Sequence, residues 1–338
     1  MDPLSALERV VHLLDRSLAP QPKVRAFQRA IDIVRSTEPG ELEHLHRTGC
    51  LTDLPGIGSS TGGVIADALD GRPPRYLDGL EASTAIPVGE GGAIRAALRG
   101  DCHTHSLWSD GGASIEKMAE TAACLGHEYL VLTDHSARLT VAHGLDVERL
   151  AEQLIEIDRL NELLHPFRIL TGMEVDILED GTLDLPEEML GRLDVVVASV
   201  HAKLSMPEPS MTKRMLRAVE SPHVDVLGHC TGRKVPGPGG RGRAASGFDA
   251  ARVFSACERT ATAVEINCRP ERQDPPDDLL VLAHELGCLF AVDSDAHAPG
   301  QLEWQPYGCD KAARHGVDPE RVINTWSSES LIEWASSR

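Results

Sequence analysis

From residue 99 onward the sequence alternates between short apolar runs and amphipathic stretches, and this alternation restricts the fold more than any other feature. The runs that we interpret as strands fall at 99–105, 128–134, 167–176, 194–201, 223–229, 262–268 and 288–295. Helical periodicity follows between them, for example at 147–164 and 250–259. Continuous apolar strands that alternate with helices are typical of a parallel sheet. Seven such units predict an α/β protein with a closed or nearly closed barrel.

An open, doubly wound sheet is the alternative arrangement for alternating strands and helices. Its usual signature is a G-x-G-x-x-G turn that opens the first helix. The stretch that follows 99–105 contains no such turn. We therefore favour the barrel.

Polar residues that can bind metals stand where the predicted strands end. They are His103, His105, Asp110, Asp134, His135, Glu174, His201, His229, Asn267, Asp293, Asp295 and His297. In an α/β barrel the carboxyl ends of the strands share one rim, where active sites are built. Isolated buried charges there would be costly, so a shared cation explains the cluster better than separate core polar residues. Imidazole and carboxylate together suit Zn, Mn or Fe rather than Ca, and so many candidates imply more than one ion.

Clustered divalent ions favour phosphoester hydrolysis, because they activate a water and clamp both the attacking and the leaving oxygen of a phosphoryl group. Amide hydrolysis by a binuclear amidohydrolase is the second interpretation. That chemistry predicts a lysine, often carboxylated, at one strand end. Glu174 stands at such a position, and no lysine ends a predicted core strand. The pattern therefore favours phosphoesters.

The N-terminal region has a different pattern, with helical periodicity at 4–18, 23–34 and 41–46. Glycines at 89, 91 and 92 are typical of a linker before the barrel. We therefore expect a small helical domain at 1–80, a linker at 81–99 and the barrel at 100–338.

A turn of sequence L-P-G-I-G at 54–58 leads into another helix, as in a helix-hairpin-helix. Gly56 and Gly58 permit backbone conformations that expose N–H groups, and these can hold a nucleic-acid phosphate. A purely packing role is the alternative, because 59–68 contains no Lys or Arg.

Composition restricts the partners and the compartment. The formal net charge of −19 opposes loose, charge-driven binding of nucleic acid. No apolar run approaches the roughly 20 residues of a membrane span, and no secretory signal is visible. The eight cysteines are scattered without a C-x-x-C pair, as in a protein with reduced thiols. We expect a cytoplasmic protein with no membrane partner.

The predicted strand ends carry a series of short motifs along the chain. These are D-x-H-x-H-S at 101–106, S-D-G at 109–111, T-D-H-S at 133–136, G-x-E at 172–174, S-V-H at 199–201, G-H at 228–229 and S-D-A-H at 294–297. Together they resemble the PHP superfamily (polymerase and histidinol phosphatase) over about residues 100–335. The resemblance implies a distorted (β/α)7 TIM-like barrel with a trinuclear metal centre of Zn, Mn or Fe.

The resemblance also implies which residues bind each ion. The first ion would be bound by the group that we also expect to be catalytic: His103, His105, Glu174 and Asp295. The second would share Glu174 as a bridge and add His201 and His229. The third would be bound by Asp110, His135 and His297.

Within the superfamily, G-H-C-T-G-R at 228–233 and E-I-N-x-x-P-x-R at 265–272 resemble the C-terminal PHP domain of bacterial family X DNA polymerases. The L-P-G-I-G turn resembles their N-terminal helical domain. The polymerase palm has no room between residues 80 and 100, so polymerase activity is not expected. Lyase chemistry is also not expected, because no Lys lies in 59–68.

The resemblance implies a 3′–5′ exonuclease or 3′-end phosphoesterase that uses a trinuclear-metal-activated hydroxide. Arg233, Arg272 and Lys203 are the candidates for gripping substrate phosphate, since guanidinium matches its geometry; a salt bridge at the rim is their alternative role. A small-molecule phosphatase, for example for histidinol phosphate, is the second functional hypothesis, which the net charge favours. A binding module with a vestigial site is the third, and the complete ligand set opposes it.

Overall fold

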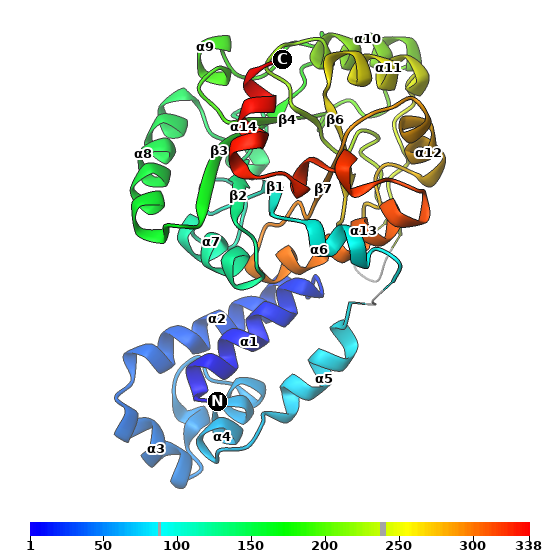
Figure 1. Ribbon diagram of the computed structural model, residues 1–338. Coiled ribbons are helices and arrows are strands. Elements are labelled where there is room, and N and C mark those ends of the chain that lie inside the picture. The colour runs from blue at the N-terminus through cyan, green and yellow to red at the C-terminus, as the bar shows by residue number, and fades with distance from the viewer. Residues whose placement is uncertain (87–88, 237–240) are drawn as a thin grey trace. The chain divides into compact units, whose positions relative to one another are not determined.

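The computed structural model describes residues 1–86, 89–236 and 241–338 (Figure 1). The chain divides into two compact units, Met1–Ile86 and Pro87–Arg338, which we call the helical unit and the barrel unit. The domain boundaries predicted from the sequence remain predictions. The predicted linker contains the end of one helix and the whole of another, and its residues 87 and 88 lie outside the described residues.

The helical unit is built from amphipathic helices that share one apolar core. They are α1 (Pro3–Arg16), α2 (Gln21–Ser36), α3 (Pro39–Arg47), α4 (Ser59–Leu69) and α5 (Arg75–Thr84), with the short 3₁₀ helix η1 (Leu51–Asp53). Leu7, Phe27 and Ile65 are among the fully buried residues of the core. The sequence predicts no helix at the position of α5, because the stretch 71–74, with Pro73 and Pro74, is typical of a break that closes a unit. Pro74 instead precedes the first turn of α5, where a missing N–H costs nothing.

The structure explains why one of the two glycines in the turn before α4 must be a glycine. Gly56 has a φ of +101°, and an added Cβ would lie 2.8 Å from Ile33 Cδ1. Gly58 donates its N–H to Thr61 Oγ1 (2.9 Å) at the start of α4. Backbone conformation and packing therefore require Gly56, and the contact of either glycine with nucleic acid remains a prediction.

Asp15 of α1 gives the helical unit an expected pH dependence. Burial raises the pKa of this carboxyl from 3.8 to about 7. Between those values the unfolded chain ionises first, so the free energy of unfolding falls as pH rises, and the loss is complete above pH 7. Asp15→Asn is expected to stabilise the unit at pH 8 by up to about 4 kcal/mol and to have little effect at pH 4. Hydrogen exchange of α1 amides in the full chain measures this; equal effects at both pH values would contradict it.

The barrel unit contains a seven-stranded parallel sheet in the order β1 to β7 within the described residues. Its strands are β1 (Gly100–Thr104), β2 (Tyr129–Leu132), β3 (Arg168–Asp176), β4 (Val195–Ser199), β5 (Val226–Leu227), β6 (Ala263–Asn267) and β7 (Phe290–Asp293). A parallel bridge between Thr104 and Ala296 brings the end of β1 beside the segment after β7. The predicted (β/α)7 barrel is confirmed, with each observed strand inside the run that predicted it.

Helices surround the strands in Figure 1. They are α6 (Gly92–Ala97), α7 (Ile115–Cys124), α8 (Val147–Leu164), α9 (Glu187–Leu190), α10 (Glu208–Val219), α11 (Ala250–Thr260), α12 (Asp277–Glu285), α13 (Gln305–Arg314) and α14 (Ser328–Ser336), with 3₁₀ helices η2 (Thr140–Ala142), η3 (Pro299–Trp304), η4 (Pro319–Arg321) and η5 (Ile323–Thr325). Among the described residues, no helix combines the length and apolar character that a membrane crossing requires.

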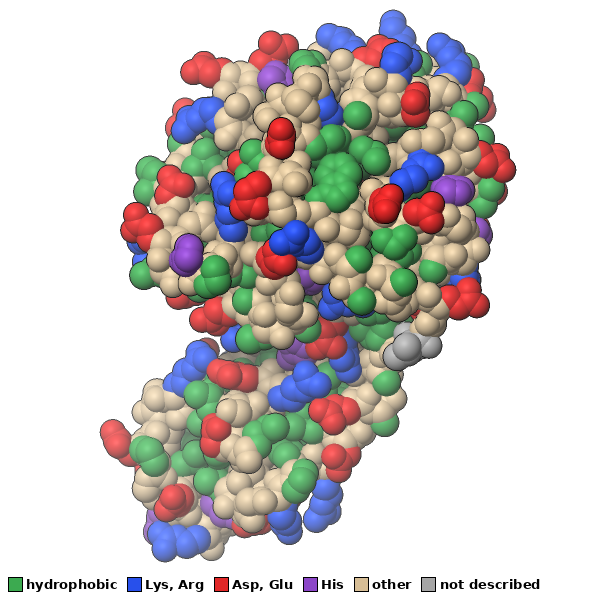
Figure 2. All heavy atoms as spheres, viewed as in Figure 1, with side chains coloured by type: hydrophobic (Ala, Val, Ile, Leu, Met, Phe, Trp, Pro, Cys, Tyr) green, Lys and Arg blue, Asp and Glu red, His purple; other side chains and the backbone are tan. Residues whose placement is uncertain are grey.

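The C-terminal segment fills the end of the barrel at which the strands begin. Ile323 and Leu331 belong to the same buried cluster as inward-facing strand residues such as Val195. The backbone N–H of Arg99 donates to Asn324 O (2.7 Å) just before β1. Helix α14 crosses this end in Figure 1, and in Figure 2 the same face of the barrel unit shows acidic and basic side chains interspersed. A functional site can therefore form only at the opposite end of the barrel, where the strands have their carboxyl ends.

Candidate metal centre

Glu174 is buried at the C-terminal end of β3, and histidines from four other strand ends surround its carboxylate. The distances to Oε2 are 3.2 Å from His103 Nε2, 3.5 Å from His105 Nε2 and 2.9 Å from His135 Nδ1, and those to Oε1 are 3.2 Å from His201 Nε2 and 2.8 Å from His229 Nε2. Residues far apart in sequence meet here because parallel strands present their carboxyl ends at one rim.

The remaining three predicted ligands extend this cluster on one side. Asp295 Oδ1 lies 3.5 Å from His105 Nε2. Asp110 Oδ1 lies 3.5 Å from His135 Nε2 and 3.4 Å from His297 Nε2. The structure therefore brings together all nine residues that the sequence singled out as metal ligands; we call them the nine-residue cluster.

Three groups of described residues could each hold a metal ion. They are His105, Asp110, His135 and His297; His103, His105 and Asp295; and His135, Glu174 and His201. His105 and His135 each belong to two groups, whereas His229 approaches Glu174 without joining one. These groups share some members with the sets that the sequence predicts for the three ions. The assignment of ligands to individual ions remains a prediction.

The donor set fits metal binding. Several buried imidazole nitrogens form no hydrogen bond of suitable geometry with a described residue. Both nitrogens of His105 are among them, as are His103 Nε2 and His201 Nε2, although the last two lie 3.2 Å from Glu174. A buried polar atom without a partner is costly. Neutral imidazole and carboxylate are the ligands that Zn, Mn and Fe prefer, so a bound cation would satisfy these atoms together.

Charge complementarity within the cluster is strong. Burial favours the neutral acid at Glu174, but the neighbouring histidines, His103 first, hold the pKa of its carboxyl well below the usual value. Burial opposes a charged His201, yet Glu174 and Asp176 raise its pKa to about 9. The negative charge of Glu174 is thus balanced by the neighbouring histidines. A bound metal ion would take over this role.

Two carboxylates behind the cluster were missed by the sequence reasoning. Glu265 Oε1 lies 2.6 Å from His103 Nδ1, and Asp176 Oδ1 lies 2.9 Å from His201 Nδ1. Such partners fix the tautomer and orientation of a ligand histidine, leaving Nε2 to face the metal. A signal for Asp176 existed, since it lies two residues from Glu174 on the same face of β3.

Glu265→Gln tests this orienting role. An amide in place of the carboxylate weakens the contact to His103 Nδ1, so we expect metal affinity and turnover to fall by about 10- to 100-fold. Metal titration of the purified variant, followed by hydrolysis of p-nitrophenyl phosphate at saturating metal, measures both. Unchanged metal affinity would contradict the role of Glu265.

The predicted phosphate-binding residues divide into two classes. Arg272 reaches the centre, where its Nε lies 3.0 Å from Asp295 Oδ2 and the side chain is 11% exposed. Arg233 instead donates its Nε–H to Arg272 O (3.1 Å) and its Nη2 to Gln273 O, and Lys203 is exposed. Arg269, which the sequence reasoning missed, donates to Asp295 O (2.8 Å) and lies 2.9 Å from His297 Nδ1.

These contacts show why Arg233 is the weaker candidate. Its guanidinium is directed to backbone carbonyls rather than to the nine-residue cluster, whereas Arg269 and Arg272 both contact Asp295. Phosphate binding by Arg272, Arg233 and Lys203 remains a prediction.

The comparison with known protein families matches part of the barrel unit. Residues 101–234 match the family described as the PHP domain. The chain carries a PHP domain. Proteins named as a 3′-5′ exonuclease and as a probable phosphatase are among the relatives of this chain.

Two relatives of this chain are named for different activities. "DNA polymerase/3′-5′ exonuclease PolX" from Bacillus subtilis (strain 168) is 40% identical over 234 residues, which are 69% of this chain. The chain spans only 40% of the length of that relative. A "Probable phosphatase" from Thermoanaerobacter sp. (strain X514) is 28% identical over 236 residues, covering 67% of this chain and 89% of the relative.

A solved structure also aligns with part of this chain. It is histidinol phosphate phosphatase from Lactococcus lactis subsp. lactis, complexed with Zn, L-histidinol and phosphate, with a TM-score of 0.47 and 16% identity over 65% of this chain and 95% of that chain.

The chemical capacity of the PHP centre follows from its residues. Bound divalent ions would activate a water and neutralise charge on a phosphoryl group. The protein contributes orientation through Glu265 and Asp176 and positive charge beside Asp295 through Arg272. Burial of the cluster strengthens each of these electrostatic contacts.

Proposed function

We propose that this protein hydrolyses nucleic-acid phosphodiesters or 3′-end phosphates, in the manner of a 3′–5′ exonuclease. The observation that carries the proposal is the convergence of the nine-residue cluster on Glu174 at one barrel rim. The similarity to the exonuclease-containing PolX supports a nucleic-acid substrate. Because the chain spans 40% of that relative, its polymerase activity is not part of the proposal.

Three divalent ions, Zn, Mn or Fe, complete the proposed enzyme. We assign His103, His105, Glu174 and Asp295 to the catalytic ion. His201 and His229 would bind the second ion with Glu174, and Asp110, His135 and His297 would bind the third. Contacts within each set support this assignment. His103 and His105 approach one oxygen of Glu174, and Asp295 approaches His105. His201 and His229 approach the other oxygen of Glu174, and Asp110 lies near His135 and His297.

The helical unit is the proposed contact for nucleic acid. The turn with Gly56 and Gly58 leads directly into α4, and a helix N-terminus carries N–H groups that suit a phosphate. A cytoplasmic location fits the eight cysteines, which are all free thiols and mostly buried.

A small phosphate ester is the second candidate substrate. Two observations favour it: the net charge of −19, and the 89% coverage of a relative named a phosphatase. The protein would then release phosphate from a compound such as histidinol phosphate with the same metal centre.

One parallel assay separates the candidates. Purified protein with Mn²⁺ or Zn²⁺ is offered a 5′-labelled oligonucleotide and histidinol phosphate. Shortening from the 3′ end supports the nuclease proposal, and phosphate release from the small ester alone rejects it. His103→Ala must abolish the activity that is observed, which excludes a contaminant.

A further inference from the structure

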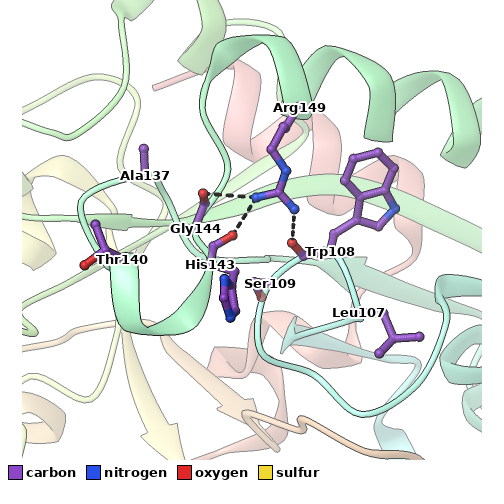
Figure 3. Close-up of a pocket in the computed structure, with 8 residues that line it drawn as sticks. All are labelled: Leu107, Trp108, Ser109, Ala137, Thr140, His143, Gly144 and Arg149. Carbon is purple, nitrogen blue, oxygen red and sulfur yellow. Dashed lines mark hydrogen bonds between the residues drawn. The ribbon is translucent and has the colours of Figure 1, made fainter.

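A pocket with a volume of about 500 Å³ opens between the loops that follow β1 and β2 (Figure 3). Ser109 in its lining directly precedes Asp110, and Ala137 follows His135 by two residues. The pocket walls are therefore the same two loops that carry candidate metal ligands. Its volume lies within the range of roughly 300–1,000 Å³ that is usual for small organic ligands.

The walls of the pocket are held in place by contacts that leave its interior free. Arg149 of α8 donates hydrogen bonds to the carbonyl oxygens of His143 (2.5 Å), Gly144 (3.1 Å) and Trp108 (Figure 3). The Trp108 indole N–H donates to Glu156 Oε2 (2.9 Å). Both loops are thus fixed to α8, which reduces the entropy cost of ligand binding.

The lining selects an uncharged, partly apolar group. Arg149 is the one charged residue that lines the pocket, and its terminal nitrogens already donate to carbonyls. Leu107 is 63% exposed, and Figure 3 draws its side chain and the His143 imidazole among the residues that line the pocket. A leucine and an imidazole exposed on loops that carry candidate metal ligands suit the face of a planar ring better than a second phosphate.

We propose that this pocket binds the base of the 3′-terminal nucleotide while its phosphate lies at the metal centre. The inference rests on the proposed nuclease function. It says where the base would bind, whereas the metal ions would contact only the phosphate. The base would lie against the His143 ring and the Leu107 side chain. Because stacking depends on the face of the ring rather than its edge, all four bases would be accepted.

Binding of the expected product tests the pocket without relying on turnover. Deoxyadenosine 5′-monophosphate and deoxyribose 5-phosphate are titrated calorimetrically into the full-length, Mn²⁺-loaded protein. The nucleotide should bind about tenfold more tightly than the sugar phosphate, and the double variant Leu107→Ala/His143→Ala should lose this preference. Equal affinities in the wild type, or a preference that survives in the variant, would overturn the proposal.

Cleavage assays then separate this proposal from the function on which it rests. An oligonucleotide with a natural 3′ terminus and one with a terminal abasic residue are compared as substrates. The wild type should favour the natural terminus about tenfold in kcat/KM, and the double variant should cut both at similar rates. If neither oligonucleotide is cut although the nucleotide preference in binding depends on Leu107 and His143, the nuclease function fails and the pocket assignment stands.

A neighbouring residue provides the matched control. Val141 is 86% exposed in the same loop as His143 and does not line the pocket. Val141→Ala should keep the wild-type preference in both assays. Loss of the preference in this control would show that any disturbance of the loop has the same effect, which would overturn the specific roles of Leu107 and His143.

Discussion

Glu174→Gln is expected to lower the rate of phosphate-ester hydrolysis by at least about a thousandfold and to release bound metal. The reason is that the carboxylate of Glu174 faces five histidines at distances of 2.8 to 3.5 Å, so no other residue of the cluster touches as many candidate ligands. Glutamine keeps the size of the side chain but removes the charge that two ions would share. Loss of several kcal/mol of charge stabilisation corresponds to a rate change of that order.

Metal content and turnover should be measured on the same preparations of this variant. Elemental analysis gives the ions per chain, and p-nitrophenyl phosphate gives a rate that does not depend on recognition of a large substrate. Glu179→Gln is the matched control, because Glu179 is an exposed glutamate just beyond β3. A Glu174→Gln protein with full metal content and turnover would show that Glu174 is not a bridging ligand.

Removal of metal by a chelator is expected to abolish hydrolysis and to lower the unfolding temperature of the barrel unit by about 10 °C. Without a cation, the buried acids Glu174 and Asp295 are left with imidazoles and with Arg272 as their neutralising partners. Bound metal at about 1,000 times its dissociation constant contributes about 4 kcal/mol, which for a domain of this size is a shift of that order.

The helical unit serves as the internal reference for this experiment. Hydrogen exchange of peptides from residues 1–86 should be unchanged by the chelator, whereas peptides that contain β1, β3 and β4 should exchange faster. Addition of Zn²⁺ or Mn²⁺ should restore both the protection and the activity. Full activity after exhaustive chelation would refute the metal-dependent chemistry.

The sequence predicted the barrel and the gathering of its ligands because both depend on local patterns. Strand period and helix period are visible in a single chain, and the parallel topology then forces the strand ends to one rim. Helix α8, for example, has the predicted bounds of 147–164. The positions of His103, Glu174 and His229 follow from that topology without any knowledge of side-chain angles.

Features that depend on side-chain direction could not be predicted in the same way. Arg233 and Arg272 both follow strand ends, yet only Arg272 contacts Asp295, whereas Arg233 is held by backbone carbonyls. In the sequence, Glu265 is one polar residue within a predicted buried strand. Its contact partner His103 lies 162 positions away, so no local pattern indicates the contact. Helix α5 was missed because a proline before a helix and a proline that ends one look alike in a single sequence.

The packing of Ile323 and Leu331 against the inner strand residues fills the end of the barrel at which the strands begin. Substrate and both products of ester cleavage are therefore expected to enter and leave at the other end, where the nine-residue cluster lies. A released nucleotide or phosphate therefore competes directly with the next substrate molecule, and we expect product inhibition of the simple competitive kind rather than escape through the far side.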